Sequence, residues 1–212
     1  MKKSSMQAGS ASAPYEISPR RRLRMTLFKL ASCAMLIALF VVLDNLGTVL
    51  VGNGIQIGFG AAPPMLAGML FGPFGGAAVY GIGDLVSALL LPKGTFHPGF
   101  TLSSALMGFI WGFFLHPHPF KKFRNWALDF DTPISRFLTA MCILIPTLVN
   151  CLVIGLFVNT LWVSQLYGSR TYLGWFLYRL SQYAVMIPVN ILLTSALLPV
   201  ATLLRKQFFK KI

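Results

Sequence analysis

The segment GMLFGPFGGAAVYGIGDLVSALLLPKGTFHPGFTLSSALMGFIWGFFLH, residues 68–116, decides the fold. It contains two apolar runs, residues 74–92 and 100–116, each close to the roughly 20 apolar residues that a membrane-spanning helix needs. Where the runs meet, the eight residues 92–99 include two prolines, two glycines, a lysine and a histidine. This arrangement predicts two transmembrane helices joined by a short loop.

The whole chain has the composition of a membrane protein. Of its 212 residues, 56% are hydrophobic and 11% are charged, whereas a soluble domain has about 45–50% apolar and about 25% charged residues. Pro63 and Pro64 must kink or break the span that contains them, because proline lacks a backbone donor. We expect an all-α membrane protein with six transmembrane helices. The other four candidate spans are residues 25–43, 55–72, 136–163 and 183–204.

The chain divides into a tail and one membrane domain. Residues 1–24 are polar and basic, which predicts a disordered cytoplasmic tail. Residues 25–212 hold all six spans and leave no room for a separate soluble domain. If the N-terminus is cytoplasmic, 15 of the 18 basic residues fall on the cytoplasmic side. The positive-inside rule then predicts that both termini lie in the cytoplasm.

Several classes of function lack the residues that they need. The net charge of +13 falls in short cytoplasmic segments and not on a soluble face, which argues against a nucleic-acid-binding domain. The chain has no GxxxxGK loop, so it cannot hydrolyse ATP itself. No set of His, Cys or carboxylate residues has metal-site spacing, and no serine sits in a nucleophile motif. We therefore expect no metal, no cofactor and no enzymatic activity.

Basic and aromatic residues meet in the two predicted outer loops. The basic residues outside the cytoplasmic segments are Lys93, Arg170 and Arg179. One interpretation is that these charges are solvated and that the aromatics belong to the membrane interface. The other is a site for a flat, conjugated ligand that bears carboxylates, held by stacking and charge-assisted hydrogen bonds. The nearby ring residues are Phe96, His97, Phe100, Trp162 and Tyr167.

One carboxylate lies deep in an apolar span. Asp84 follows AVYGIG and precedes LVSALLL. A carboxylate at membrane depth is costly, so it normally has a partner or a function. Both a structural hydrogen bond to a neighbouring helix and a role in ligand binding remain open.

Small residues recur at helical spacing in the first and second spans. Ala34 and Ala38 lie one above the other on the first span, with Ala31 close to the same stripe, and Gly68 and Gly72 repeat the pattern in the second. Such stripes let another helix approach closely. Packing within the chain and docking of a partner helix both remain open.

Four sequence blocks, in their order and spacing, resemble the S components of energy-coupling factor (ECF) vitamin transporters, and specifically the folate group. The blocks are GMLFGPFGGAAVYGIGDLVSALLLP, FHPGFTLSSALMGFIWGFF, VNTLWVSQLYG and YRLSQYAVMIPVNILL. The resemblance implies six helices in the bacterial plasma membrane, with both termini inside and a vitamin pocket capped by outer loops. It also implies docking through Ala31, Ala34 and Ala38 onto a T component that carries two ATPase subunits, and toppling of the S component during transport.

The predicted ligand is folate, because its ring suits the aromatics and its carboxylates suit the cations. Pantothenate, which has a carboxylate but no ring, is the alternative vitamin. A stand-alone proton-coupled carrier that uses Asp84 as its relay is the alternative from another class. The candidate ligand-binding residues are Asp84, Lys93, Phe96, His97, Pro98, Gly99, Phe100, Trp162, Tyr167, Arg170, Arg179 and Gln182.

Overall fold

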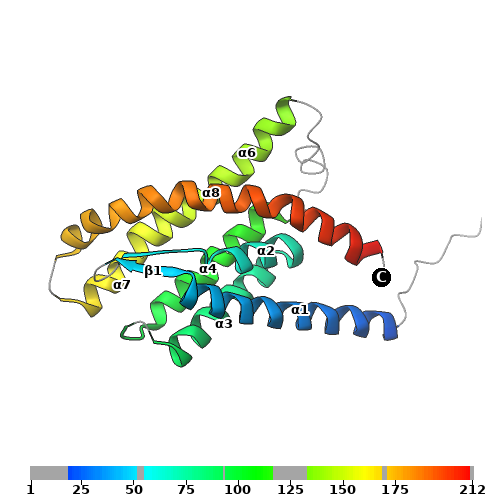
Figure 1. Cartoon of the computed structure of the whole chain (residues 1–212), viewed down its shortest axis with the longest axis horizontal. Coiled ribbons are helices and arrows are strands. Elements are labelled where there is room, and N and C mark those ends of the chain that lie inside the picture. The colour runs from blue at the N-terminus through cyan, green and yellow to red at the C-terminus, as the bar shows by residue number, and fades with distance from the viewer. Residues whose placement is uncertain (1–18, 52–54, 93, 117–132, 169–170, 211–212) are drawn as a thin grey trace, which may run out of the picture.

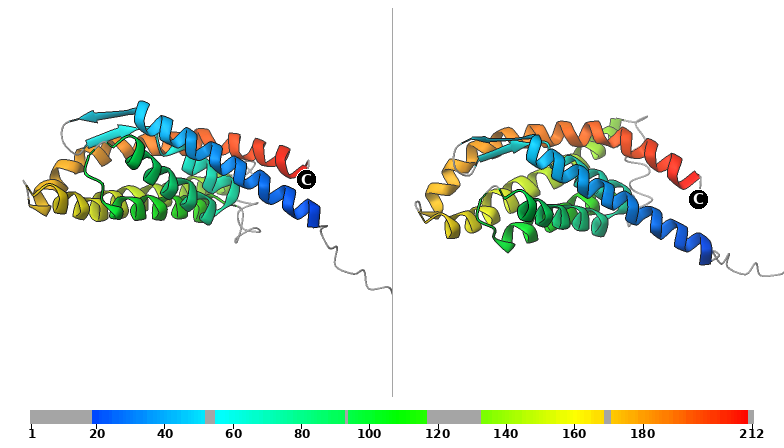
Figure 2. Two further views of the ribbon diagram at one scale, coloured as in Figure 1. Left: turned by 90° about the horizontal axis from the view of Figure 1, so that it is seen from below. Right: turned by 60° about the horizontal axis from the view of Figure 1, so that its bottom comes forward.

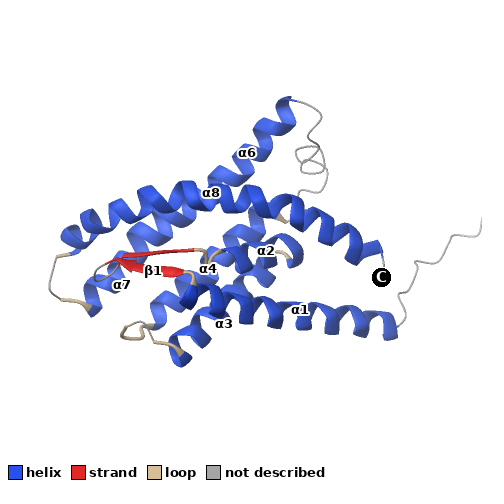
Figure 3. Ribbon diagram, in the orientation of Figure 1, coloured by secondary structure: helices blue, strands red, loops and turns tan. Residues whose placement is uncertain are grey.

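The computed structural model describes residues 19–51, 55–92, 94–116, 133–168 and 171–210. Helices dominate the described chain, and a two-stranded antiparallel hairpin interrupts them (Figure 3). In chain order the elements are α1 (Pro19–Leu46), β1 (Thr48–Val51), β2 (Ile55–Gly58), α2 (Ala62–Phe71), α3 (Pro73–Leu90), α4 (Pro98–Leu115), α6 (Pro133–Leu148), the π-helix η1 (Val149–Val158), α7 (Asn159–Leu166) and α8 (Tyr172–Lys210).

The helices have the lengths that a multi-pass membrane protein requires. Within the described ranges, five helical stretches are long and apolar enough to cross a membrane, and α2 is a shorter apolar helix. α6, η1 and α7 follow one another without a break, and residues 137–166 within them count as one such stretch. The predicted helical membrane fold is confirmed, with five membrane-capable helical stretches and the shorter apolar helix α2 in the described ranges. The start of α1 and the end of α8 lie at the same end of the molecule (Figure 1), in keeping with an even number of passes.

The first helix begins earlier than the sequence analysis placed it. α1 starts at Pro19, so residues 19–24, which were assigned to the disordered tail, are helical. Proline is well tolerated in the first turn of a helix, and arginine and leucine are good helix formers. Residues 1–18, the rest of the predicted tail, lie outside the described residues.

The prediction of a second span over residues 55–72, kinked or broken at Pro63 and Pro64, is wrong in its first half. Residues 55–58 form strand β2, which pairs with β1 in a register that places Thr48 opposite Gly58. The sequences TVLV and IQIG are rich in the β-branched residues that favour strands. Pro63 and Pro64 then stand in the first turn of α2, where a missing backbone donor costs little.

The last helix is also longer than predicted. α8 begins at Tyr172, eleven residues before the predicted start of the sixth span, and it contains Pro188 and Pro199. Arg179 and its polar neighbours lower the local hydropathy, which is why the sequence pattern assigned this segment to a loop. In Figure 1, α8 arches over the whole length of the molecule, as expected for a helix with interior prolines.

Helices α2, α3 and α4 form the most tightly packed part of the bundle. A Cβ on Gly76 would collide with the backbone oxygen of Gly108, and a Cβ on Gly68 would lie 2.8 Å from the backbone nitrogen of Gly112. These glycines therefore let α3 and α2 approach the backbone of α4, as small residues do between membrane helices. Gly72, with a φ of 86°, makes the turn between α2 and α3. The small-residue pattern of Gly68 and Gly72 thus serves internal packing.

The hairpin lies beside the outer parts of α1 and α8. β1 contacts the end of α1, and β2 contacts α8. Figure 2 shows the hairpin and α8 on one side of the molecule and α3, α4 and α7 on the other, with α1 running diagonally from one side to the other. The functional cavity lies between these two sides.

Candidate functional site

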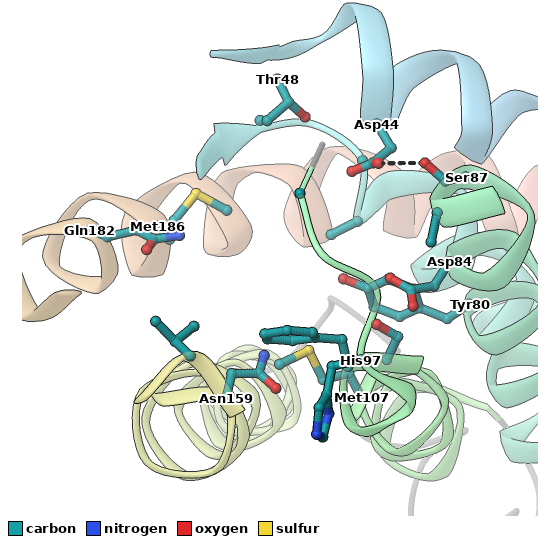
Figure 4. A pocket seen from close by; sticks show the side chains of 18 of the residues that line it. Asp44, Thr48, Tyr80, Asp84, Ser87, His97, Met107, Asn159, Gln182 and Met186 are labelled. Atoms are coloured by element: carbon teal, nitrogen blue, oxygen red, sulfur yellow. Dashed lines mark hydrogen bonds between the residues drawn. The ribbon is translucent and has the colours of Figure 1, made fainter. Parts of the chain in front are cut away.

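A cavity of about 490 Å³ lies among α1, the hairpin, α3, α4, the helix from η1 to α7, and α8. Its volume is within the roughly 300–1,000 Å³ that is typical of small-molecule sites. Figure 4 shows its walls: Asp44 and Asp84 on one side, Gln182 and Met186 across from them, and Asn159 pointing inward from a third helix. Aromatic, amide, carboxylate and guanidinium groups all line this one space.

Two carboxylates are anchored by hydroxyl groups on one side of the cavity. Ser87 Oγ donates a hydrogen bond of 2.9 Å to Asp44 Oδ2, and Asn45 Nδ2 donates one of 2.9 Å to the same hydroxyl. Thr101 Oγ1 donates a hydrogen bond of 2.8 Å to Asp84 Oδ2. These bonds tie α1 to α3 and α3 to α4, and both carboxylates remain in the cavity lining.

The segment before α4 forms an aromatic corner at one end of the cavity. His97 caps the first turn of α4, because its Nδ1 accepts a hydrogen bond of 3.1 Å from the backbone N–H of Gly99. A Cβ on Gly99 would lie 2.6 Å from the indole of Trp162. Glycine is therefore required for the start of α4 to lie against α7. Phe96 and Phe100 line the cavity next to this corner.

Helix α8 contributes a buried cation. The Arg179 side chain is 6% exposed, and its Nη2 donates a hydrogen bond of 3.0 Å to Tyr183 Oη. Its Nε and Nη1 are buried and have no hydrogen-bond partner among the described residues. Buried polar groups are nearly always paired, and a guanidinium binds carboxylates in a bidentate fashion. This end of the cavity is suited to a carboxylate ligand.

Three asparagines form a second polar group that the sequence analysis missed. Asn150, Asn159 and Asn190 line the cavity, and the Oδ1 atom of each is buried without a hydrogen-bond partner in the described chain. A polar side chain inside an apolar helix was the available signal. The asparagines are far apart in sequence, so no motif joined them.

The structure brings seven of the twelve predicted ligand-binding residues to this cavity. Gly99 and Trp162 pack against each other outside the lining, and Pro98 is exposed and is not part of it. Lys93 and Arg170 lie outside the described residues. Arg179, predicted in a loop, lies instead on helix α8. The seven lining residues are Asp84, Phe96, His97, Phe100, Tyr167, Arg179 and Gln182.

Metal chemistry finds no support in the described part of the chain. No group of three or more His, Cys, Asp or Glu side chains in these ranges could hold a metal ion. The donors and acceptors of the cavity are those of a binding site for an organic ligand.

Comparison with known proteins identifies relatives of one kind. The family model described as "ECF-type riboflavin transporter, S component" matches residues 24–199. The chain is 35% identical over 136 residues to the folate transporter FolT of Clostridium novyi (strain NT), a match that covers 64% of this chain and 68% of that protein. These relatives are transporter components and not enzymes.

A solved structure shares the fold. The crystal structure of FolT bound with folic acid matches with a TM-score of 0.64 and 28% sequence identity. The match covers 79% of this chain and 90% of that one. Sequence and fold therefore point to the same group of membrane transport proteins.

Proposed function

The chain belongs to the family of S components of ECF-type transporters, and we propose that it is the membrane subunit that captures folate from outside the cell. The observation that carries this proposal is the composition of the cavity described above. It combines aromatic walls and hydrogen-bond acceptors with the buried Arg179, whose Nε and Nη1 have no partner in the described chain.

Folate fits this combination better than the other vitamins considered. Riboflavin, named in the description of the matching family, has a flat ring system but no carboxylate for Arg179. Pantothenate has a carboxylate but no ring for the aromatic walls. Folate has both a pterin ring and a glutamate with two carboxylates. Of the relatives named above, one is a folate transporter and one is a FolT structure with bound folic acid.

The proposed binding mode assigns the two ends of folate to different walls. The glutamate carboxylates pair with Arg179, and Lys93 and Arg170 are proposed to add charge at the same end. The pterin ring lies deeper, where Asp84 accepts its N–H groups. Phe96, Phe100, His97 and Tyr167 enclose the ligand, with Gln182 on the α8 wall.

Import requires partners, which we propose to be a T component and two ATPase subunits. The chain lacks a GxxxxGK loop, so the energy of ATP must come from another subunit. Ala31, Ala34 and Ala38 are exposed on α1, which leaves a stripe of small side chains available to a helix of the T component. Both termini are proposed to be cytoplasmic, and the S component to topple in the membrane and carry its cavity inward.

Titration of the purified protein in detergent tests the ligand. Folic acid, riboflavin and pantothenate are added separately, and binding is followed by tryptophan fluorescence and confirmed by equilibrium dialysis. We expect folic acid to bind at micromolar concentration or below and the other two to bind at least about a hundredfold more weakly. Tighter binding of riboflavin or pantothenate would refute the folate assignment.

Arg179→Met and Arg179→Lys refine this test. Loss of the guanidinium removes a charge-assisted pair, which typically costs about 2–5 kcal/mol when buried. Arg179→Met should therefore weaken folic acid binding at least about thirtyfold. Lys keeps the charge without the fork geometry, so Arg179→Lys should fall between Met and wild type.

A stand-alone proton-coupled carrier is the second candidate, since Asp84 is a carboxylate of a membrane helix that lines the cavity. Proteoliposomes that contain only this chain distinguish the two functions. Uptake of folic acid driven by a pH gradient and abolished in Asp84→Asn would favour the carrier. Uptake that requires ATP and the partner subunits would exclude it.

A further inference from the structure

The π-helix η1 lies in the middle of the helix that lines the cavity. π-Helical segments are rare and are frequently found at functional sites. Here the segment runs over ten residues, Val149–Val158. From η1 and α7, the cavity lining takes Asn150, Cys151, Asn159, Val163 and Leu166.

The spacing of these residues does not fit one face of an α-helix. Asn150 and Asn159 are nine residues apart. An α-helix has 3.6 residues per turn, so nine residues make about two and a half turns and would place the two side chains on opposite sides. The i→i+5 hydrogen bonds of a π-helix give between four and five residues per turn, so nine residues make about two turns. The π-helix therefore aligns Asn150 with Asn159.

Contacts with two neighbouring helices hold this segment. Asn150 Nδ2 donates a hydrogen bond of 3.2 Å to the backbone oxygen of Met107 on α4. Asn190 Nδ2, on α8, donates one of 3.4 Å to Cys151 Sγ. Gly155 lets the ring of Tyr183 pack against the helix, since a Cβ there would lie 2.7 Å from the Tyr183 hydroxyl. The wide turn is thus fixed between α4 and α8.

The contact with Met107 also fixes the orientation of the Asn150 amide. The backbone oxygen of Met107 can only accept a hydrogen bond, so the nitrogen of Asn150 must face it and the oxygen must face away. The Oδ1 atoms of Asn150, Asn159 and Asn190 are buried and unpartnered among the described residues. Asn150 and Asn190 are 3% and 7% exposed. All three asparagines belong to the cavity lining, so this wall has three amide oxygens that have no partner among the described residues.

We propose that η1 recognises the heterocycle of the ligand. Its π-helical pitch aligns Asn150 with Asn159, so that both amide oxygens accept hydrogen bonds from N–H groups of one ring system. Asn190 provides a third acceptor. This inference rests on the proposed function and names the residues that accept hydrogen bonds from the pterin. Ionised carboxylates offer no donors, so these oxygens cannot hold the carboxylates of the glutamate. The pterin offers an amino group and a ring N–H.

The positions along α8 agree with a ligand that lies lengthwise. Arg179 and Asn190 are eleven residues apart on this helix, which corresponds to about 17 Å along its axis. The unpartnered donors of Arg179 and the unpartnered acceptor of Asn190 thus mark two well-separated ends of the cavity. An elongated molecule with carboxylates at one end and N–H donors at the other satisfies both.

Binding of two probes to Asn150→Leu and Asn159→Leu tests the proposal. The probes are folic acid and 4-aminobenzoyl-glutamate, the part of folic acid that lacks the pterin. Leucine has the same number and branching of side-chain heavy atoms as asparagine but no acceptor. Each variant should lower the affinity for folic acid at least about tenfold and change that for 4-aminobenzoyl-glutamate less than about twofold. The ratio of the two affinities is the readout, because a misfolded variant loses both.

A matched control lies on the same helix. Val153 is 51% exposed and is not part of the cavity lining, so Val153→Ala should leave both affinities unchanged. If wild type binds folic acid and the leucine variants keep the wild-type ratio, the role of η1 is refuted while the folate assignment stands. If wild type binds neither probe, the folate assignment fails and this inference falls with it.

Discussion

The ring of His97 stacks on the indole of Trp162, with centroids 5.1 Å apart and an interplanar angle of 27°. Trp162 Nε1 also donates a hydrogen bond of 3.1 Å to Ser103 Oγ on α4. A residue of α7 therefore holds both the cap and the second turn of α4. This contact fixes the outer corner of the cavity, next to Phe96 and Phe100.

Trp162→Ala should weaken folic acid binding about tenfold without direct loss of a ligand contact. The substitution removes the aromatic pair with His97, which contributes about 0.5–1.5 kcal/mol, and the hydrogen bond to the Ser103 hydroxyl. The segment from Phe96 to Phe100 is then no longer held in place. Trp162→Phe keeps a ring to stack on and should lose less. Equilibrium dialysis is the suitable assay, because the substitution removes a fluorophore.

The control for this substitution is Phe74→Leu, an aromatic side chain that is 80% exposed on α3 and away from the cavity lining. It should bind folic acid as wild type does. Unchanged affinity in Trp162→Ala would mean that the corner does not organise the site.

Gly76→Val should destabilise the bundle rather than act on the ligand. A side chain at this position would collide with the backbone oxygen of Gly108 on α4, and overpacking of this kind typically costs about 1–3 kcal/mol. The midpoint of thermal unfolding in detergent should fall by several degrees. Ala78→Val, at an exposed position on the same helix, should leave it unchanged, and equal midpoints for the two variants would refute the close contact.

Much of this fold could be predicted because glycine and proline mark the helix ends. The spans predicted over residues 74–92 and 100–116 correspond to Pro73–Leu90 and Pro98–Leu115. The hairpin could not be predicted from hydropathy, because its strands are as apolar as the helix that follows them. The start of α8 was missed for the opposite reason: a buried arginine made a helical segment resemble a loop.

The site was predictable where residue type alone carries a signal. A carboxylate in an apolar span singled out Asp84, and the rare outer cations singled out Arg179. Asn150 and Asn159 are also polar residues within an apolar helix, but with the usual 3.6-residue period they fall on opposite sides of it, so no pattern joined them. Their convergence follows from the π-helix, which depends on packing against α4 and α8.

Asp84→Leu and Thr101→Val separate two roles of the Asp84 carboxylate. If its function is the 2.8 Å hydrogen bond between α3 and α4, both variants should lower the unfolding midpoint by similar amounts and leave folic acid binding intact. If it accepts N–H groups of the pterin, as proposed, Asp84→Leu should weaken binding at least about tenfold, while Thr101→Val should change it less than about threefold. Calorimetric titration and thermal unfolding of the same samples give both readouts.

Ala34→Leu and Ala38→Leu should abolish assembly with the T component but leave folic acid binding unchanged. Both alanines are exposed on the outer face of α1, and the added bulk would separate two helices that approach through small residues. Met35→Leu is the matched control, because Met35 is 75% exposed on the same helix and the exchange conserves volume. Affinity purification of the T component and its ATPases, followed by quantification of the S component recovered, measures assembly. Recovery of both alanine variants at the level of Met35→Leu would show that the partner docks elsewhere on this chain.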